Sequence, residues 1–223
     1  MGYRPGDALG FRAVAVATIL SGLGDVSKDR GELTAARKSY EDSFSIQHQT
    51  GEEQAAGQTQ LALALISIEE GRLEDAEGVV RQCQEQFRKE HEADDELSAT
   101  AVLIQALLAQ GKKAEAKMEM DRAQPLATKS QNRFASLQFA LASASFFLAS
   151  DNPESSRTPL QQILKEAHGH GYLGVEFEAR FALAELDKKS GHGADAQAQL
   201  TSLERTANAK GFGLIARKAA TLK

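Results

Sequence analysis

The residues of this chain that could do chemistry are few and widely spaced. His168 and His170 flank a glycine, and His192 follows further along the chain, so these imidazoles are the candidates for a metal site. A structural zinc site needs four ligands at regular spacing, and no cluster of Cys or Asp residues completes such a set. Their spacing matches no known ligand pattern, so we predict no metal site.

A nucleophile is equally hard to assign. The lone cysteine, Cys83, falls at a small, buried-type position of a predicted helix, which favours a structural thiol over a catalytic one. The chain has no phosphate-binding glycine loop and no GxSxG, HExxH or CxxC motif. Carboxylates on helices mostly pair with Lys or Arg one turn away on solvated faces. We therefore predict no catalytic residue, no cofactor and no enzymatic activity.

The composition of the 223 residues excludes several classes of protein. Hydrophobic residues make up 42% and charged residues 26%, which excludes a disordered chain and a polytopic membrane protein. The net charge of −5 disfavours direct nucleic-acid binding. A single cysteine gives no sign of an oxidising compartment, so a cytoplasmic location is the default. Residues 11–23 loosely resemble a short secretory signal, but a buried amphipathic helix is the preferred interpretation.

Charge is divided unevenly along the chain. Residues 1–111 carry 10 basic and 19 acidic residues, whereas residues 112–223 carry 16 and 12. This asymmetry could orient a bipolar partner or favour head-to-tail association. A chance distribution over solvated faces explains it equally well.

Glycines recur at a fixed period of forty positions that organises the whole chain. Gly31, Gly71, Gly111 and Gly191 belong to this series, and Asp151, in an Asp-Asn-Pro turn sequence, takes the missing place. A second series, offset by half a period, contains Gly51, Gly171 and Gly211, with His91 and Gln131 in the gaps. Two turns in each period leave room for two helices of about 15–18 residues, which predicts a helical-hairpin repeat.

Two further positions repeat with the turn. A small residue follows it, and a larger apolar residue comes one helical turn later. The small residues are Ala36, Ala76, Ala116, Ser156 and Ala196, and the larger ones are Tyr40, Val80, Met120, Leu160 and Leu200. We expect the small residue to let two helices approach closely and the larger one to fill the space between hairpins.

This pattern resembles the tetratricopeptide repeat (TPR). The segment LGDVSKDRGELTAARKSY, with its Leu-Gly pair, turn glycine, alanine and aromatic residue, carries the resemblance best. The period is longer than the usual one of about 34 residues. Longer helices occur in variants such as kinesin light chains and large bacterial transcriptional activators. The resemblance implies an all-α, right-handed superhelical solenoid with a role in protein–protein interaction, as in bacterial signalling or transcription regulators.

The repeat predicts the organisation of the chain. Residues 1–10 are expected to form a flexible leader, and residues 11–223 a single solenoid domain. Five hairpins are expected at residues 13–52, 53–92, 93–132, 133–172 and 173–211, followed by a capping helix at 212–223. Pro125 should kink or shorten its helix. Thr158 should cap a helix in the fourth hairpin, where the longer preceding connection predicts an irregularity.

In a tetratricopeptide superhelix the first helix of each hairpin lines the concave side. Transferring these positions gives a groove that is apolar in the middle and charged at both ends, where Lys28 and Glu178 lie. The predicted partner-binding residues are Leu61, Leu65, Ile68, Gln105, Leu108, Gln138, Leu141, Ser145, Leu148, Phe181 and Glu185. Such a groove suits an amphipathic helix or an extended apolar peptide. Contact of these residues with the chain itself is the competing interpretation.

Two alternatives from other classes remain open. One is a self-assembling module, a homodimer joined through the apolar groove or the final helix. The other is a sensor of small ligands or peptides, which would need more polar groups in the groove than Gln105, Gln138 and Ser145. The preferred hypothesis is a non-catalytic scaffold for a protein or peptide partner, with no membrane contact and no direct contact with nucleic acid.

Overall fold

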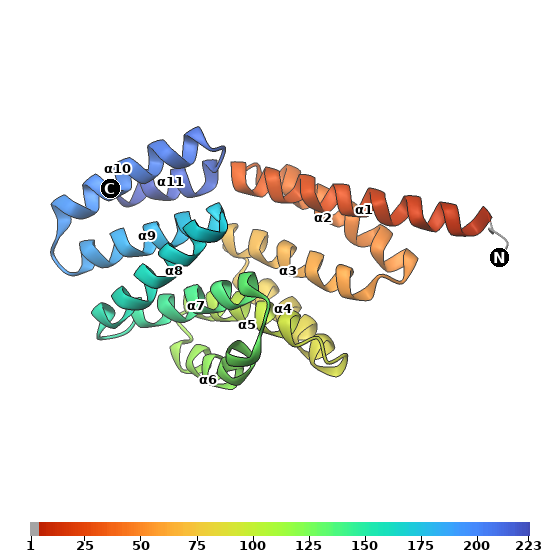
Figure 1. Ribbon diagram of the computed structural model, residues 1–223, viewed down its shortest axis with the longest axis horizontal. Helices are drawn as coiled ribbons and strands as arrows, with labels where there is room; N and C mark the ends of the chain where they lie inside the picture. The colour runs from red at the N-terminus through yellow and green to blue at the C-terminus, as the bar shows by residue number, and fades with distance from the viewer. Residues whose placement is uncertain (1–4) are drawn as a thin grey trace.

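Short turns join most of the helices (Figure 1). The computed structural model describes residues 5–223, and in that range it contains eleven α-helices and one 3-10 turn. The elements are α1 (Pro5–Arg30), α2 (Leu33–Thr50), α3 (Glu53–Glu69), α4 (Leu73–Lys89), α5 (Ala93–Ala109), α6 (Lys113–Lys129), α7 (Arg133–Leu148), η1 (Pro153–Ser156), α8 (Arg157–His170), α9 (Leu173–Lys189), α10 (Gly193–Ala209) and α11 (Gly213–Leu222).

The predicted glycine series forms these turns. Gly71 adopts a φ of 76°, donates its N–H to the Ile68 carbonyl at 3.0 Å, and is followed by Arg72, which donates to the Ser67 carbonyl at 2.8 Å. The positive φ is why glycine is needed here. Six other glycines repeat this conformation: Gly31, Gly51, Gly111, Gly171, Gly191 and Gly211. His91 also adopts this left-handed conformation, with a φ of 62°, although the conformation is less favourable for a residue with a side chain than for glycine.

The repeated small and large residues pack as predicted. All five small residues and all five larger ones are buried. In the first hairpin Gly24 lies against Tyr40, so that a Cβ atom at Gly24 would come within 2.5 Å of the Tyr40 ring. The Tyr40 hydroxyl donates to Asp25 at 2.7 Å, and its pKa is raised, first by burial and then by this carboxylate. Close approach of α1 and α2 therefore depends on the missing side chain of Gly24.

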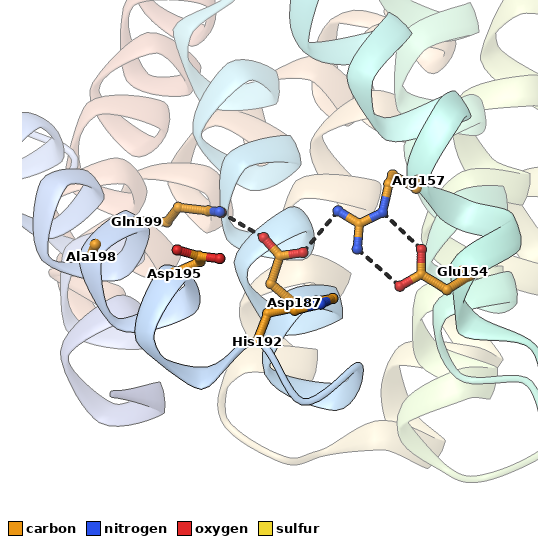
Figure 2. A pocket seen from close by; sticks show the side chains of 7 residues that line it. All are labelled: Glu154, Arg157, Asp187, His192, Asp195, Ala198 and Gln199. Carbon is orange, nitrogen blue, oxygen red and sulfur yellow. Dashed lines mark hydrogen bonds and ion pairs between the residues drawn. The ribbon is translucent and has the colours of Figure 1, made fainter.

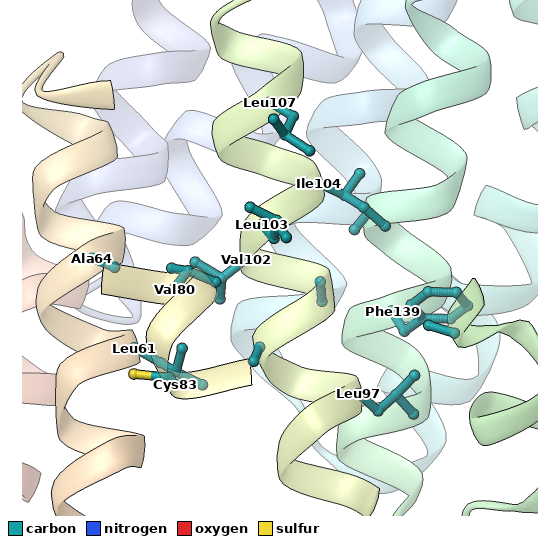
Figure 3. Close-up of a cluster of buried hydrophobic side chains, with 14 of the residues drawn as sticks. Leu61, Ala64, Val80, Cys83, Leu97, Val102, Leu103, Ile104, Leu107 and Phe139 are labelled. Atoms are coloured by element: carbon teal, nitrogen blue, oxygen red, sulfur yellow. The ribbon is translucent and has the colours of Figure 1, made fainter. Parts of the chain in front are cut away.

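Helix α5 is the centre of the main core (Figure 3). Nine of its residues are buried, including Leu97, Leu103 and Leu107. It packs against α3, α4, α6 and α7, and the same cluster contains Leu61 and Phe139. A helix that is apolar on every side must be covered on every side, which is why α5 lies inside the array.

The regular pattern breaks around α7. Neither Gln131 nor Asp151 adopts the left-handed conformation found at the other turns. Ser130, which ends α6, is extended, and α7 begins with the Asn132 side chain accepting the Ala135 N–H at 3.1 Å. Helix α7 packs mainly on α5 rather than on α6, and η1 occupies the connection to α8. The predicted irregularity of the fourth hairpin is confirmed.

Three predictions of detail need correction. Helix α1 begins at Pro5, so residues 5–10 of the expected leader are helical, whereas residues 1–4 lie outside the described residues. Proline is favourable in a first helical turn, which explains the early start. Helix α8 begins at Arg157 after η1, so Thr158 is not its cap. Pro125 does not shorten α6, because it lies near the exposed C-terminal end, where water can replace the lost hydrogen bond.

Candidate functional site

The odd-numbered helices form an inner layer of the array. Helices α3, α5, α7, α9 and α11 each contact the next one in this series, and α11 also contacts α1. Helices α4, α6 and α10 lie outside them (Figure 1). The inner layer is therefore the surface on which the predicted partner-binding residues must be sought.

The structure places the predicted residues on this layer with different exposures. Nine are partly exposed: Leu65, Ile68, Gln105, Leu108, Gln138, Leu141, Ser145, Phe181 and Glu185. The other two are buried, Leu61 at 6% exposure beside Cys83 and Val80, and Leu148 at 5% in the cluster of α7, α8 and α9. Their side chains serve the core, so Leu61 and Leu148 are withdrawn as surface residues.

The partly exposed members give the inner layer a mixed surface. Leu65, Ile68 and Leu108 rest on the main core cluster, and Leu141 rests on the next cluster. Their remaining surface is interrupted by polar side chains, including Gln105. The Ser145 hydroxyl donates to the Leu141 carbonyl at 3.0 Å. The surface offers small apolar areas between amides and a hydroxyl, rather than a deep apolar groove.

The last helix closes the inner layer by returning to the first hairpin. Arg217 of α11 donates to the Gly31 carbonyl at 2.9 Å and to the Arg30 carbonyl at 3.3 Å. Lys218 forms an ion pair with Glu69 of α3. These residues are 149 to 187 positions apart in sequence. We name these contacts of Arg217 and Lys218 the closure contact.

Charged groups gather behind the closure contact. Glu178 of α9 faces Lys218 and Glu69, and Lys28 and Asp29 of α1 lie close by. Burial raises the pKa of Glu178, and the neighbouring lysines oppose this shift. Burial alone would lower the pKa of Lys218, but the carboxylates of Glu178 and Glu69 raise it overall. Two residues of the predicted charged ends, Lys28 and Glu178, therefore meet at one place.

Comparison with known proteins agrees with this architecture. The family described as the MalT-like TPR region matches residues 9–218. The chain belongs to this family. No curated protein sequence matches it. The predicted all-α TPR solenoid is confirmed.

Solved structures resemble the array in fold. Two crystal structures of nearly identical TPR-like repeats, described as from a kinesin light chain of Podosopora anserina, superpose with TM-scores of 0.55 and 0.54, the first being a point variant of the second. Each is 17% identical and covers 89% of this chain, and the chain covers 96% and 97% of them. TPR arrays generally serve as protein-interaction scaffolds. Among residues 5–223, no helix combines the length and apolar character needed to cross a membrane.

An open cleft of about 570 Å³ lies between η1, α8, α9 and α10 (Figure 2). Arg157 binds Glu154 at 2.8 and 2.9 Å and Asp187 at 2.8 Å. Gln199 donates to the other Asp187 oxygen at 2.6 Å. Hydrogen bonds from Arg157, and then from Ser190, lower the pKa of Glu154 to about 2. These polar side chains are hydrogen-bonded to one another. Their bonds hold the irregular connection before α8 against α9 and α10.

The acidic residues in the first turn of α5 also bond to neighbouring helices. Asp94 accepts the Ser130 hydroxyl at 2.6 Å, and Asp95 accepts the Gln54 and Gln58 amides at 2.7 and 2.8 Å. Glu96 pairs with Arg88 at 2.9 Å. These carboxylates lie in the first turn of the helix, where they are favoured, and they also hold neighbouring repeats together.

The residues weighed for chemistry have structural partners. His168 contacts Glu176 at 3.0 Å, and His170 stacks on Tyr172. Within residues 5–223 no group of three or more His, Cys, Asp or Glu side chains is arranged to hold a metal ion. Cys83 is buried, and burial raises the pKa of its thiol to about 11. Such a thiol is a poor nucleophile, as the sequence predicts.

Sequence reasoning missed the closure contact. Neither Arg217, Lys218 nor Glu69 belongs to a motif. The only available signal was the charge asymmetry, because the basic last helix meets the acidic first half of the chain. From the sequence, that asymmetry could orient a partner, favour head-to-tail association or be a chance distribution over solvated faces, whereas part of it is satisfied inside one chain.

Proposed function

We propose that this TPR array is a non-catalytic scaffold that binds a partner helix or peptide on its inner layer. The observation that carries the proposal is the partial exposure of nine predicted residues on four consecutive inner helices. Neighbouring residues of the same helices, such as Leu103 and Ile66, are fully buried. These partly exposed side chains can therefore contact a partner without any change in the core.

The proposed partner has mixed chemistry. Its apolar side chains would cover Leu65, Leu108 and Leu141, while its polar groups would bond to the amides of Gln105 and Gln138. The charged group around Glu178 and Lys218 would fix the direction of a partner whose end carries charge. The resemblance to repeats of bacterial transcriptional activators supports the finer proposal that the array serves within a signalling or transcription regulator.

A pair of variants tests the inner layer. Leu65→Glu with Leu108→Glu places two carboxylates on it, and Met118→Glu places one on outer helix α6, where Met118 is 71% exposed. Circular dichroism first checks that each variant keeps its helix content. Affinity capture from host lysate with all three baits then identifies partners, and calorimetry measures the affinity of each purified partner.

We expect the double variant to lose at least about tenfold in affinity, because two apolar contacts become buried charges. The Met118→Glu protein should bind as the parent does. A partner bound equally by the parent and the folded double variant would contradict the proposal, as would a partner lost only with Met118→Glu.

A further inference from the structure

Helix α11 lies at the C-terminal end of α1 and is tied into the array by two kinds of contact (Figure 1). Its buried apolar residues, Ile215, Ala216 and Ala219, form one cluster with residues of α9 and α10. Towards the first hairpin and α3 it makes the polar contacts of Arg217 and Lys218. Among the described side chains, no apolar cluster contains residues of both α11 and α1–α3. The two sides of the closure contact are therefore held together without a shared apolar core.

A close backbone approach determines how α11 meets the first hairpin. Gly213 is the first residue of α11, and a Cβ atom there would come within 2.6 Å of the Arg30 carbonyl oxygen. A backbone oxygen cannot swing aside as a long side chain can, so closure needs a residue without a side chain at this position. Gly193 is likewise the first residue of α10, but a Cβ atom there would meet nothing within 4 Å. These two glycines form a matched pair, of which only Gly213 lies at the closure contact.

Closing the array has both a gain and a cost in free energy. The guanidinium of Arg217 lies at the C-terminal end of α1, where free carbonyls carry partial negative charge, and Lys218 pairs with Glu69. Against this, closure takes the charges of Lys218 and Glu178 away from water, and burial opposes both charged forms. Ion pairs that remain partly exposed contribute little net stability. Gain and cost nearly offset each other, so closed and open arrangements lie close in free energy.

We propose that α11 is a latch, which closes the array onto the first hairpin and releases it when the ionic strength rises. Opening breaks polar contacts without unpacking a core, because each repeat of a solenoid contacts mainly its neighbours and small rotations add up along the array. Salt screens the attraction of Lys218 for the carboxylates of Glu69 and Glu178. Lys28 and Asp29, also near Glu178, have opposite signs and act on it in opposite directions. Salt therefore favours the open arrangement.

The latch would control when charged groups of the inner layer become available. In the closed arrangement Lys218 is paired with Glu69 and faces Glu178. In the open arrangement these groups face water and can meet a partner. This consequence rests on the proposed function, whereas the movement of α11 does not, since it is measured without any partner. Failure of the latch and failure of the scaffold are therefore separate results.

Distances between spin labels on the full chain test the proposal. The labels are placed at exposed position 34 in the first hairpin and exposed position 220 in α11. Distances are measured from about 50 mM to about 1 M sodium chloride, a range over which screening becomes strong. The same series is run with Gly213→Ala, with the matched control Gly193→Ala and with Lys218→Gln. Circular dichroism checks that each labelled protein keeps its helix content.

We expect short distances in the parent and in Gly193→Ala at low salt, and at least about a fivefold rise in the proportion of long distances at high salt. Gly213→Ala should give long distances at every salt concentration, because its Cβ atom prevents closure. Lys218→Gln should give more long distances than the parent at low salt, and it decides the matter if Gly213→Ala loses helix content. Distances in the parent that do not change with salt would overturn the proposal. So would a folded Gly213→Ala protein with distances as short as those of Gly193→Ala.

Discussion

The two ends of the array are finished in different ways. At the C-terminal end, Arg217 of α11 bonds to the first hairpin and Lys218 pairs with Glu69 of α3, and the exposed positions of α11 carry no large apolar residue. At the N-terminal end, α1 leaves Val16, Ile19, Leu23 and Val26 exposed, although residues equivalent to Ile19 and Val26 in later hairpins, such as Ala99 and Ile66, are buried. The comparison shows that one repeat sequence can produce a closed end or an end with exposed apolar side chains, depending on what packs beside it.

The largest effect on the free energy of unfolding is expected on the side of α1 that packs against α2. Gly24→Ala would place a Cβ atom 2.5 Å from the Tyr40 ring, so α1 and α2 must separate or the ring must move. We expect a loss of about 1–3 kcal/mol in the free energy of unfolding, measured by urea denaturation of dilute protein.

Gly22→Ala is the matched control on the open side of the same helix. Its Cβ atom meets nothing, so the substitution should stabilise the monomer by up to about 1 kcal/mol through helix propensity. Equal losses from the two substitutions would show that α1 has no difference between a packed side and an open side.

A smaller effect on stability is expected from a change of pH. Its sign should differ between Glu77, in the middle of the array, and Glu178, near the closure contact. Glu77 accepts hydrogen bonds from Lys112, Gln110 and Arg81 at 2.7 to 2.9 Å, and these partners, with Lys112 first, lower its pKa to about 2. Its stabilising contribution is therefore present above the ordinary pKa of 4.5 and is lost as the pH falls from there to about 2.

Glu178 should behave in the reverse manner. Because burial raises its pKa, the folded chain holds this proton more tightly than the unfolded chain does, and stability falls as the pH rises above the ordinary value of 4.5. At neutral pH, Glu77→Gln should cost about 1 kcal/mol, whereas Glu178→Gln should be neutral or stabilising. Urea denaturation of both variants from acidic to neutral pH gives the comparison, and slopes of the same sign would contradict it.

The helices could be predicted because their limits are set locally. A left-handed glycine ends a helix whatever surrounds it, so the glycine period alone placed most helix boundaries close to those observed. Ala36 and Tyr40 were equally predictable, because every hairpin needs a small and a large residue at those positions. The turns at Gln131 and Asp151 lack glycine and do not adopt the left-handed conformation, so the glycine period does not predict their geometry.

The surfaces were less predictable, because exposure depends on distant neighbours. Leu61 and Leu65 have the same side chain on the same helix, yet only Leu61 is buried in the core. Leu23 and Leu103 occupy equivalent repeat positions, yet Leu23 is 53% exposed and Leu103 is 0% exposed, since only the second is covered by a preceding hairpin. The closure contact joins residues 186 positions apart, and no local pattern encodes such a distance.

The smallest effect on stability is expected at the closure contact, and it also provides the most direct test of the difference between the two ends. Spin labels at exposed positions 34 and 220 would report the distance from the first hairpin to α11, while buried Cys83 should stay unlabelled. Arg217→Ala with Lys218→Gln should change the free energy of unfolding by less than about 1 kcal/mol, because both contacts are polar and the glutamine adds no negative charge beside Glu178 and Glu69.

The decisive measurement is therefore the distance distribution between these labels in the parent and in that double variant. We predict one short, narrow distribution in the parent and a longer, broader one in the variant at nearly equal stability. A long, broad distribution in the parent, or one that the double variant leaves unchanged, would contradict the claim that Arg217 and Lys218 close the array.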